Sequence, residues 1–173
     1  MRIVALAAGV FMAGLVVLAC RAGPAWGEAA LMERQLPFSV ALGGAQAAMQ
    51  RCLEGDYRVV VTVVDPAGGV KATLRADGAN PHLLEGAMRK AYTAAMLRIG
   101  TVRMGEIVAP SPGAAGLMAF DRMTALGGGL PIRVGEDVLG GIGVAGVPVG
   151  GAGGAGDEGC AQAGLERMTG LVQ

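Results

Sequence analysis

The chain has 173 residues with 14 basic and 14 acidic side chains, so its formal net charge is zero. It carries no basic run with interleaved aromatic residues, which argues against nucleic acid as a partner. The sequence contains one histidine, which argues against a metal site built from several histidines and gives little support for a Ser-His-Asp triad.

Residues 1–27 are predicted to be a signal peptide. Arg2 supplies the positive start, residues 3–19 are apolar and uncharged, and small residues at Ala25-Trp26-Gly27 mark a cleavage site before Glu28. The mature chain, residues 28–173, has the length of one ordinary domain. We therefore expect a periplasmic or secreted protein that has no membrane contact after cleavage.

Two alternatives for this first segment stay open. The apolar run is close to the length that spans a bilayer, so an uncleaved anchor is one of them. The other is a lipoprotein attached at Cys20, because Val17-Leu18-Ala19-Cys20 resembles a lipobox.

The first half of the mature chain predicts a helix followed by a β-hairpin. A short lead-in over residues 28–35 ends at Pro37, and apolar residues then recur at helical spacing over 38–54. The β-branched run 57–65 predicts a strand that is central or covered on both faces. Turn residues follow, and residues 70–75 return as an antiparallel neighbour.

The most regular helix is predicted over residues 82–99, after the breaker Asn80-Pro81. Its small residues Ala87, Ala91, Ala94 and Ala95 would let another element pack very close to it. After Thr101 we expect irregular chain with one helical turn near residues 117–120.

A second hairpin is predicted from residues 130–134 and 138–145, joined by the tight turn 135–137. Pro131 suits an edge strand or a strand start. A glycine-rich loop over 146–156 would lead into a last helix that begins at Asp157 or Glu158 and runs through Met168, with these two acids capping it.

Residues 141–146 contain a literal G-x-G-x-x-G, which can mark a dinucleotide-binding turn. Here the glycines fall inside the predicted strand, and no second parallel strand follows them. We expect Gly141 and Gly143 to leave one face of the strand bare instead, so that a helix or a bound planar molecule can approach the sheet closely.

Two cysteines remain if Cys20 leaves with the signal peptide. Cys52 and Cys160 are then either a disulfide, in a compartment that permits one, or two buried free thiols.

Several segments in this order resemble the GlcG/HbpS family, which also occurs as the C-terminal domain of PduO-type cobalamin adenosyltransferases. The resemblance covers residues 36–168 and rests on the following segments: Val63-Val64-Asp65-Pro66-Ala67-Gly68, Arg75-Ala76-Asp77-Gly78, Arg89 to Ala95, Gly128 to Ile132, Gly140 to Gly146, and Asp157 to Ala161.

The resemblance implies an α/β (α+β) domain, with a five-stranded antiparallel sheet, helices packed on it and a profilin-like three-layer topology. It also implies assembly into homo-oligomers and haem as a cofactor. Members of the family without an established activity are common, so the resemblance is a firmer guide to fold than to function.

His82 is the first candidate site residue, because imidazole is the commonest protein ligand to haem iron; the alternative is a ring that faces water in the first helical turn. Lys90 and Arg89 could pair with haem propionates or a substrate carboxylate. Alternatively, they would lie on an ordinary solvated helix face or form an ion pair with Asp65 or Asp77 that fixes the helix to the first hairpin. Tyr92 and Thr93 could supply a weak oxygen ligand or a hydrogen bond to the pocket; the alternative is that both belong to the core.

Soft methionines could line an apolar pocket or ligate iron, although methionine more often fills a core; they are Met88, Met96, Met104, Met118 and Met123. We see no Ser or Cys nucleophile with a base beside it.

The favoured hypothesis is an exported haem-binding or haem- and redox-sensing protein without catalytic activity. One alternative is an enzyme or accessory subunit acting on a small organic acid or alcohol, which would need Lys90, Asp65 and Asp77 to converge on one cleft. Another is a structural partner of a periplasmic oxidoreductase.

Overall fold

The computed structural model describes residues 33–148 and 154–172 of the chain. The predicted signal peptide, Cys20 and residues 149–153 of the glycine-rich loop lie outside the described residues. Of the lead-in over residues 28–35, the described residues 33–35 are not helical. None of the helices in these ranges is both long and apolar enough to cross a membrane.

The described residues form five α-helices, one short 3-10 helix and four strands. In chain order these are α1 (Phe38–Glu54), β1 (Val60–Val64), β2 (Val70–Arg75), α2 (Leu83–Leu97), α3 (Thr101–Val108), α4 (Pro112–Ala115), η1 (Gly116–Ala119), β3 (Gly129–Val134), β4 (Asp137–Ala145) and α5 (Ala155–Thr169).

The four strands make one antiparallel sheet in the order β2-β1-β4-β3. Both predicted hairpins are present, β1 is central and fully buried, and β3 with its Pro131 lies at an edge. The resemblance implied five strands, whereas the described residues supply four. The α+β class and the packing of helices on an antiparallel sheet are confirmed.

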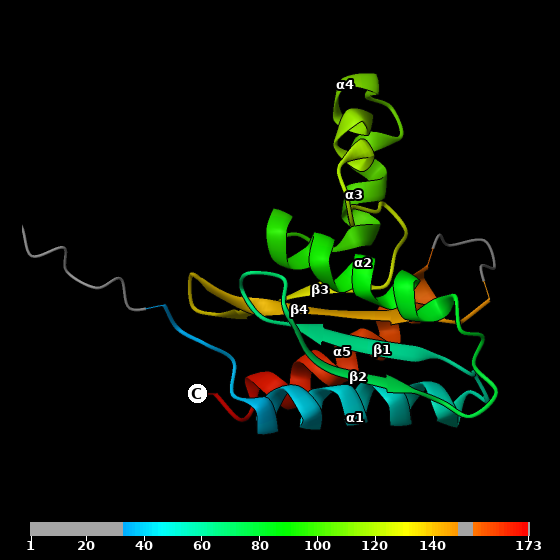
Figure 1. Ribbon diagram of the computed structural model, residues 1–173, viewed down its shortest axis with the longest axis vertical. Coiled ribbons are helices and arrows are strands. Elements are labelled where there is room, and N and C mark those ends of the chain that lie inside the picture. The colour runs from blue at the N-terminus through cyan, green and yellow to red at the C-terminus, as the bar shows by residue number, and fades with distance from the viewer. Residues whose placement is uncertain (1–32, 149–153, 173) are drawn as a thin grey trace, which may run out of the picture. The chain divides into compact units, whose positions relative to one another are not determined.

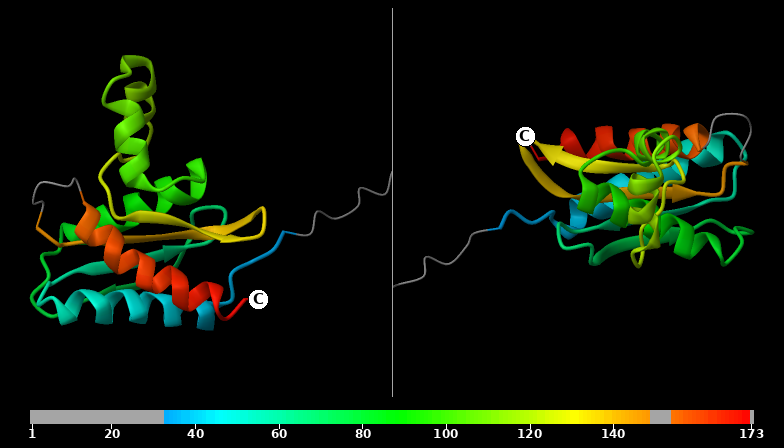
Figure 2. Two further views of the ribbon diagram at one scale, coloured as in Figure 1. Left: turned by 180° about the vertical axis from the view of Figure 1, so that it is seen from behind. Right: turned by 90° about the horizontal axis from the view of Figure 1, so that it is seen from above.

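Helices cover both faces of the sheet, as Figures 1 and 2 show. Helices α1 and α5 lie side by side on one face and enclose the larger core with the inward side chains of all four strands. Helix α2 lies on the other face, across β4, β1 and β3. Its core clusters consist mainly of valines and alanines.

Helix α2 packs backbone to backbone on β4. A Cβ atom built on Gly141 would lie 2.2 Å from the carbonyl oxygen of Ala91, and one on Gly143 would lie 2.2 Å from that of Ala87. The bare strand face predicted from the sequence is therefore occupied by a helix. These glycines lie within β4 rather than in a turn between a strand and a helix, so the dinucleotide motif is a coincidence of spacing.

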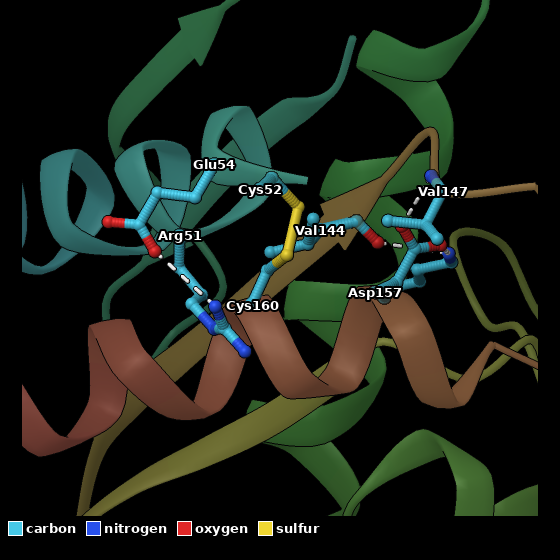
Figure 3. The surroundings of a disulfide bond; sticks show 8 residues. Arg51, Cys52, Glu54, Val144, Val147, Asp157 and Cys160 are labelled. Carbon is cyan, nitrogen blue, oxygen red and sulfur yellow. Dashed lines mark hydrogen bonds and ion pairs between the residues drawn. A yellow bond between two sulfur atoms is a disulfide. The ribbon is translucent and has the colours of Figure 1, made fainter. Parts of the chain in front are cut away.

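Cys52 on α1 and Cys160 on α5 are joined by a disulfide whose Cα atoms are 5.5 Å apart (Figure 3). Both residues are buried in the larger core. Of the two alternatives left open by the sequence, the structure contains the disulfide, which ties together the two helices that cover the same face of the sheet.

Residues 101–119 were expected to be mostly irregular, and this expectation was wrong for α3. Helix α3 and the short α4 and η1 project away from the sheet (Figure 1). Few described contacts join this arm to the other elements, mainly those of α3 with α2 and β3. Gly105 in a helix of eight residues weakens the local signal.

Replacing Gly143 by alanine should push α2 off the sheet, because the new methyl group would overlap the Ala87 carbonyl. We expect the free energy of unfolding to fall by about 1–3 kcal/mol or more. Urea denaturation measures this change. Gly113→Ala is the matched control, since no atom lies within 4 Å of its added Cβ. Equal stabilities of the two variants would contradict the close packing.

Candidate functional site

A cavity of about 570 Å³ lies where the chain leaves β4 and α2 begins. We call it the α2 cavity. Its wall is partly apolar, with Leu83, Leu126, Ala145, Val147 and Pro148, and partly polar, with side chains from the start of α2, the loop before β1 and the first turn of α5. Its volume is in the range of small-molecule sites, about 300–1,000 Å³.

His82 stands immediately before α2 and lines this cavity with an exposed side chain. Gly86 and Lys90 line the same cavity, and spacings of four residues place these positions on one face of the helix. The imidazole is therefore accessible at the mouth of the cavity. It is free of the tertiary packing that would hold a core histidine.

Lys90 lies at the buried side of the cavity and is paired with Asp157 from α5. Its Nζ donates to Oδ2 of Asp157 over 2.7 Å and to the carbonyl oxygen of Val144 over 2.9 Å. The two side chains are only 7% and 5% exposed. The other carboxylate oxygen of Asp157 accepts the backbone N–H of Val147 (Figure 3). Lys90 does form an ion pair, as one alternative from the sequence expected, but its partner is Asp157 and not Asp65 or Asp77.

Arg58 contributes a second cation to the α2 cavity. It was not among the site residues predicted from the sequence. It belongs to the loop between α1 and β1, and its Nη2 pairs with Oδ1 of Asp56 over 3.0 Å. The two side chains are 53% and 88% exposed, so water screens the pair strongly and it is readily exchanged. Arg58, unlike Lys90, can turn its guanidinium to a ligand without leaving a buried charge alone.

Three of the predicted site residues lie away from the cavity lining. Arg89 pairs with Glu85 one turn earlier on α2. Tyr92 packs against Gly68, and its ring lies under the guanidinium of Arg122. Thr93 is fully buried, and its Oγ1 accepts the backbone N–H of Thr124. The hydroxyl group of Thr93 is therefore enclosed among the described residues and does not line the α2 cavity.

The acidic residues of the first hairpin do not converge with Lys90. Asp65 Oδ1 accepts the backbone N–H groups of Ala67 and Gly69 and so closes the β1–β2 turn. Asp77 is exposed and lines a different cavity. The five methionines considered for iron ligation are also not among the residues lining the α2 cavity.

Glu158, next to Asp157, faces the base of the projecting arm. Its Oε2 is buried and has no hydrogen-bond partner among the described residues. Burial raises the pKa of the Glu158 carboxyl above its ordinary value of 4.5, and the carboxylate of Glu106 raises it further. The backbone N–H groups of Val102 and Gly128 act in the opposite direction and do not cancel the effect of burial. The buried carboxyl of Glu158 thus lies beside the first turn of α3, which has no acid of its own, and burial disfavours the charged form of this carboxyl.

The described residues contain no cluster of three or more His, Cys, Asp or Glu side chains that could hold a bare metal ion. A cavity with one accessible imidazole, an apolar wall and a half-exposed arginine instead suits an organic ligand that carries a carboxylate.

Comparison with known proteins gives a consistent picture. A family model described as haem degrading protein HbpS-like matches residues 36–166. The crystal structure of HbpS superposes with a TM-score of 0.74 at 34% identity, covering 82% of this chain and 96% of that one. A crystal structure of a PduOC:haem complex gives a TM-score of 0.70 at 26% identity, over 78% of this chain and 95% of that one.

A curated protein of Citrobacter freundii, an uncharacterised 15.0 kDa protein of the dhaT-dhaS intergenic region, is also similar. It is 36% identical over 104 residues, which is 59% of this chain and 73% of its own length.

Removing one partner of the Lys90–Asp157 pair should destabilise the fold strongly, because the other charge would stay buried alone. For Lys90→Met and for Asp157→Asn we expect losses of about 3–5 kcal/mol in the free energy of unfolding, and for the double variant less than their sum. Urea denaturation provides the measurement. Arg103→Gln and Glu106→Gln, which break the exposed pair on α3, serve as controls and should cost at most about 1 kcal/mol. Additive losses for the buried pair would contradict the coupling.

The raised pKa of Glu158 predicts a specific pH dependence of stability. The folded state binds the proton more tightly than the unfolded chain, so the contribution of Glu158 to stability is largest below pH 4.5 and falls as the pH rises through the folded pKa. Glu158→Gln should remove this decline. Unfolding free energies measured across that pH range test it, with the exposed Glu166→Gln as the control. Parallel curves for wild type and Glu158→Gln would contradict the assignment.

Proposed function

This chain belongs to the HbpS-like family, and from that premise we propose that its α2 cavity binds haem. The observation that carries the proposal is that the single histidine of the sequence lies, accessible, at the mouth of a partly apolar cavity of about 570 Å³. The structural similarity to a haem complex of PduOC supports it.

The residues of the cavity fit the chemical demands of haem. His82 offers an exposed imidazole as an axial ligand to the iron, and Arg58 offers a guanidinium that suits a propionate carboxylate. Leu83 and Leu126 provide apolar surface for the porphyrin. When bound, the haem would supply redox chemistry at its iron; the chain would hold it, orient it and exclude water from part of its surface.

Lys90 has a different role in this proposal from the one expected from the sequence. Its ammonium group is already neutralised by Asp157 and the Val144 carbonyl, so it shapes and rigidifies the wall instead of pairing with a propionate. The cation for the ligand is Arg58.

We further propose that the protein is exported and works in an oxidising compartment, with residues 1–27 as its signal peptide and residues 28–173 as its single domain. The disulfide between Cys52 and Cys160 supports this, because such bonds persist outside the reducing cytosol. We propose that it acts as a homo-oligomeric haem-binding or haem-sensing protein.

Haem degradation is the second candidate, and the description of the family favours it. An enzyme acting on a small organic acid is less well supported, because Lys90, Asp65 and Asp77, which it required, do not share one cleft. Loss of bound haem absorbance in the presence of a reductant and dioxygen, but not with the reductant alone, would distinguish degradation from simple binding.

Titrating the mature protein with haemin tests the proposal. We expect saturable binding with a shifted Soret band. His82→Ala should change the band position because the iron loses its ligand, whereas Arg58→Gln should weaken binding up to about tenfold without changing the band.

Arg103→Gln, an exposed arginine on α3, is the matched control for Arg58 and should leave binding unchanged. A wild-type spectrum identical to that of free haemin would overturn the proposal. A shift that His82→Ala does not alter would leave haem bound but exclude His82 as its ligand.

A further inference from the structure

A second cavity, of about 590 Å³, lies between α1 and the edge strand β2 and shares Arg58 with the α2 cavity. We call it the α1–β2 groove. Apart from Arg58, none of its lining residues belongs to the site described above. It therefore calls for a separate explanation, which does not depend on haem binding.

The floor of the groove is apolar. Met49 and Leu53 come from α1, one turn apart, and Leu74 comes from β2. Leu53 is 37% exposed, although it is a large apolar residue next to a packed core. A bound hydrocarbon chain would bury this surface and gain about 25 cal/mol for each Å² removed from water.

Two guanidinium groups lie beside this floor. Arg75 Nη1 donates to the carbonyl oxygen of Ala79 over 3.2 Å, which holds the side chain in place while its other N–H groups stay available. Arg58 is held by the strongly exposed Asp56, an exchangeable partner. Planar guanidinium groups match a carboxylate better than any other side chain does.

Asp77 also lines the groove, and it limits which anions fit. Its exposed carboxylate repels any anion, and it repels a ligand with two or more negative charges more strongly than one with a single charge. The groups that face the groove thus favour a single carboxylate attached to an apolar body over a phosphate or a dicarboxylate.

We propose that the α1–β2 groove is a second ligand site, which binds a small amphipathic monocarboxylate. The carboxylate pairs with Arg75 and Arg58, and the aliphatic chain lies on Met49, Leu53 and Leu74. Because Arg58 lines both cavities, a ligand in the groove draws on the same guanidinium that faces the α2 cavity.

Hexanoate is a suitable probe, with hexan-1-ol as the uncharged ligand of the same chain length. We expect saturable changes in amide chemical shifts, followed by heteronuclear NMR, at residues of the groove. Arg75→Gln and replacement of hexanoate by hexan-1-ol should each weaken binding about tenfold, the value of a charge-assisted hydrogen bond. Leu53→Ser, at an exposed position, should weaken both ligands alike.

Two controls separate this site from the α2 cavity. Arg103→Gln and His82→Ala should leave hexanoate binding unchanged, and Arg75→Gln should leave haemin binding unchanged. Hexanoate shifts centred on His82 would overturn the proposal, as would equal binding of hexanoate and hexan-1-ol or an unchanged affinity in Arg75→Gln. Failure of haemin to bind would leave the hexanoate result standing.

Discussion

The arrangement of the molecule depends on one steric constraint, the direct contact between the backbone of α2 and β4. Two glycines on the same face of the strand leave no Cβ atoms between the sheet and the helix. The alanines of α2 complete this contact from the helix side. Because the helix lies so close, Lys90 reaches past β4 to the carbonyl oxygen of Val144 and meets Asp157, which belongs to a helix on the opposite face. The buried ion pair therefore follows from the glycines.

The two faces of the sheet consequently serve different purposes. On one face, bulky side chains such as Ile132 and Ile142 of the sheet and Met168 of α5 fill the core beneath α1 and α5, and a disulfide joins the two helices. On the other face, α2 packs closely on the sheet through small residues, and the apolar core between them has a small volume. The α2 cavity opens at the end of this thin layer, next to a buried pair that keeps α2 and α5 in register.

Much of this fold could be predicted because its signals are local. The two hairpins, the central β1 and the helices α1, α2 and α5 follow from periodicity and turn residues. The role of Gly141 and Gly143 followed from their spacing of two in a strand. Helix α3 escaped prediction because it is short, contains Gly105 and packs next to Glu158, which is distant in sequence. No local pattern reports such a tertiary contact.

The candidate site was less predictable for the same physical reason. His82 was singled out as the one histidine of the sequence and Lys90 as a cation on the predicted helix, but neither signal reveals a partner. Asp157 is 67 residues away along the chain, and it determines that Lys90 is a structural cation. Arg58 gave no sequence signal, since it precedes an ordinary strand.

Lys90 and Arg58 differ in how much free energy the protein would lose if either left its present carboxylate partner for a ligand. A ligand that took Lys90 would have to leave Asp157 charged and buried, at a cost of several kcal/mol. One that took Arg58 would only release Asp56 into water, which costs little. Recognition of an anion at this end of the sheet would therefore fall to Arg58 on the loop, while Lys90 on α2 maintains the wall against which the ligand would lie.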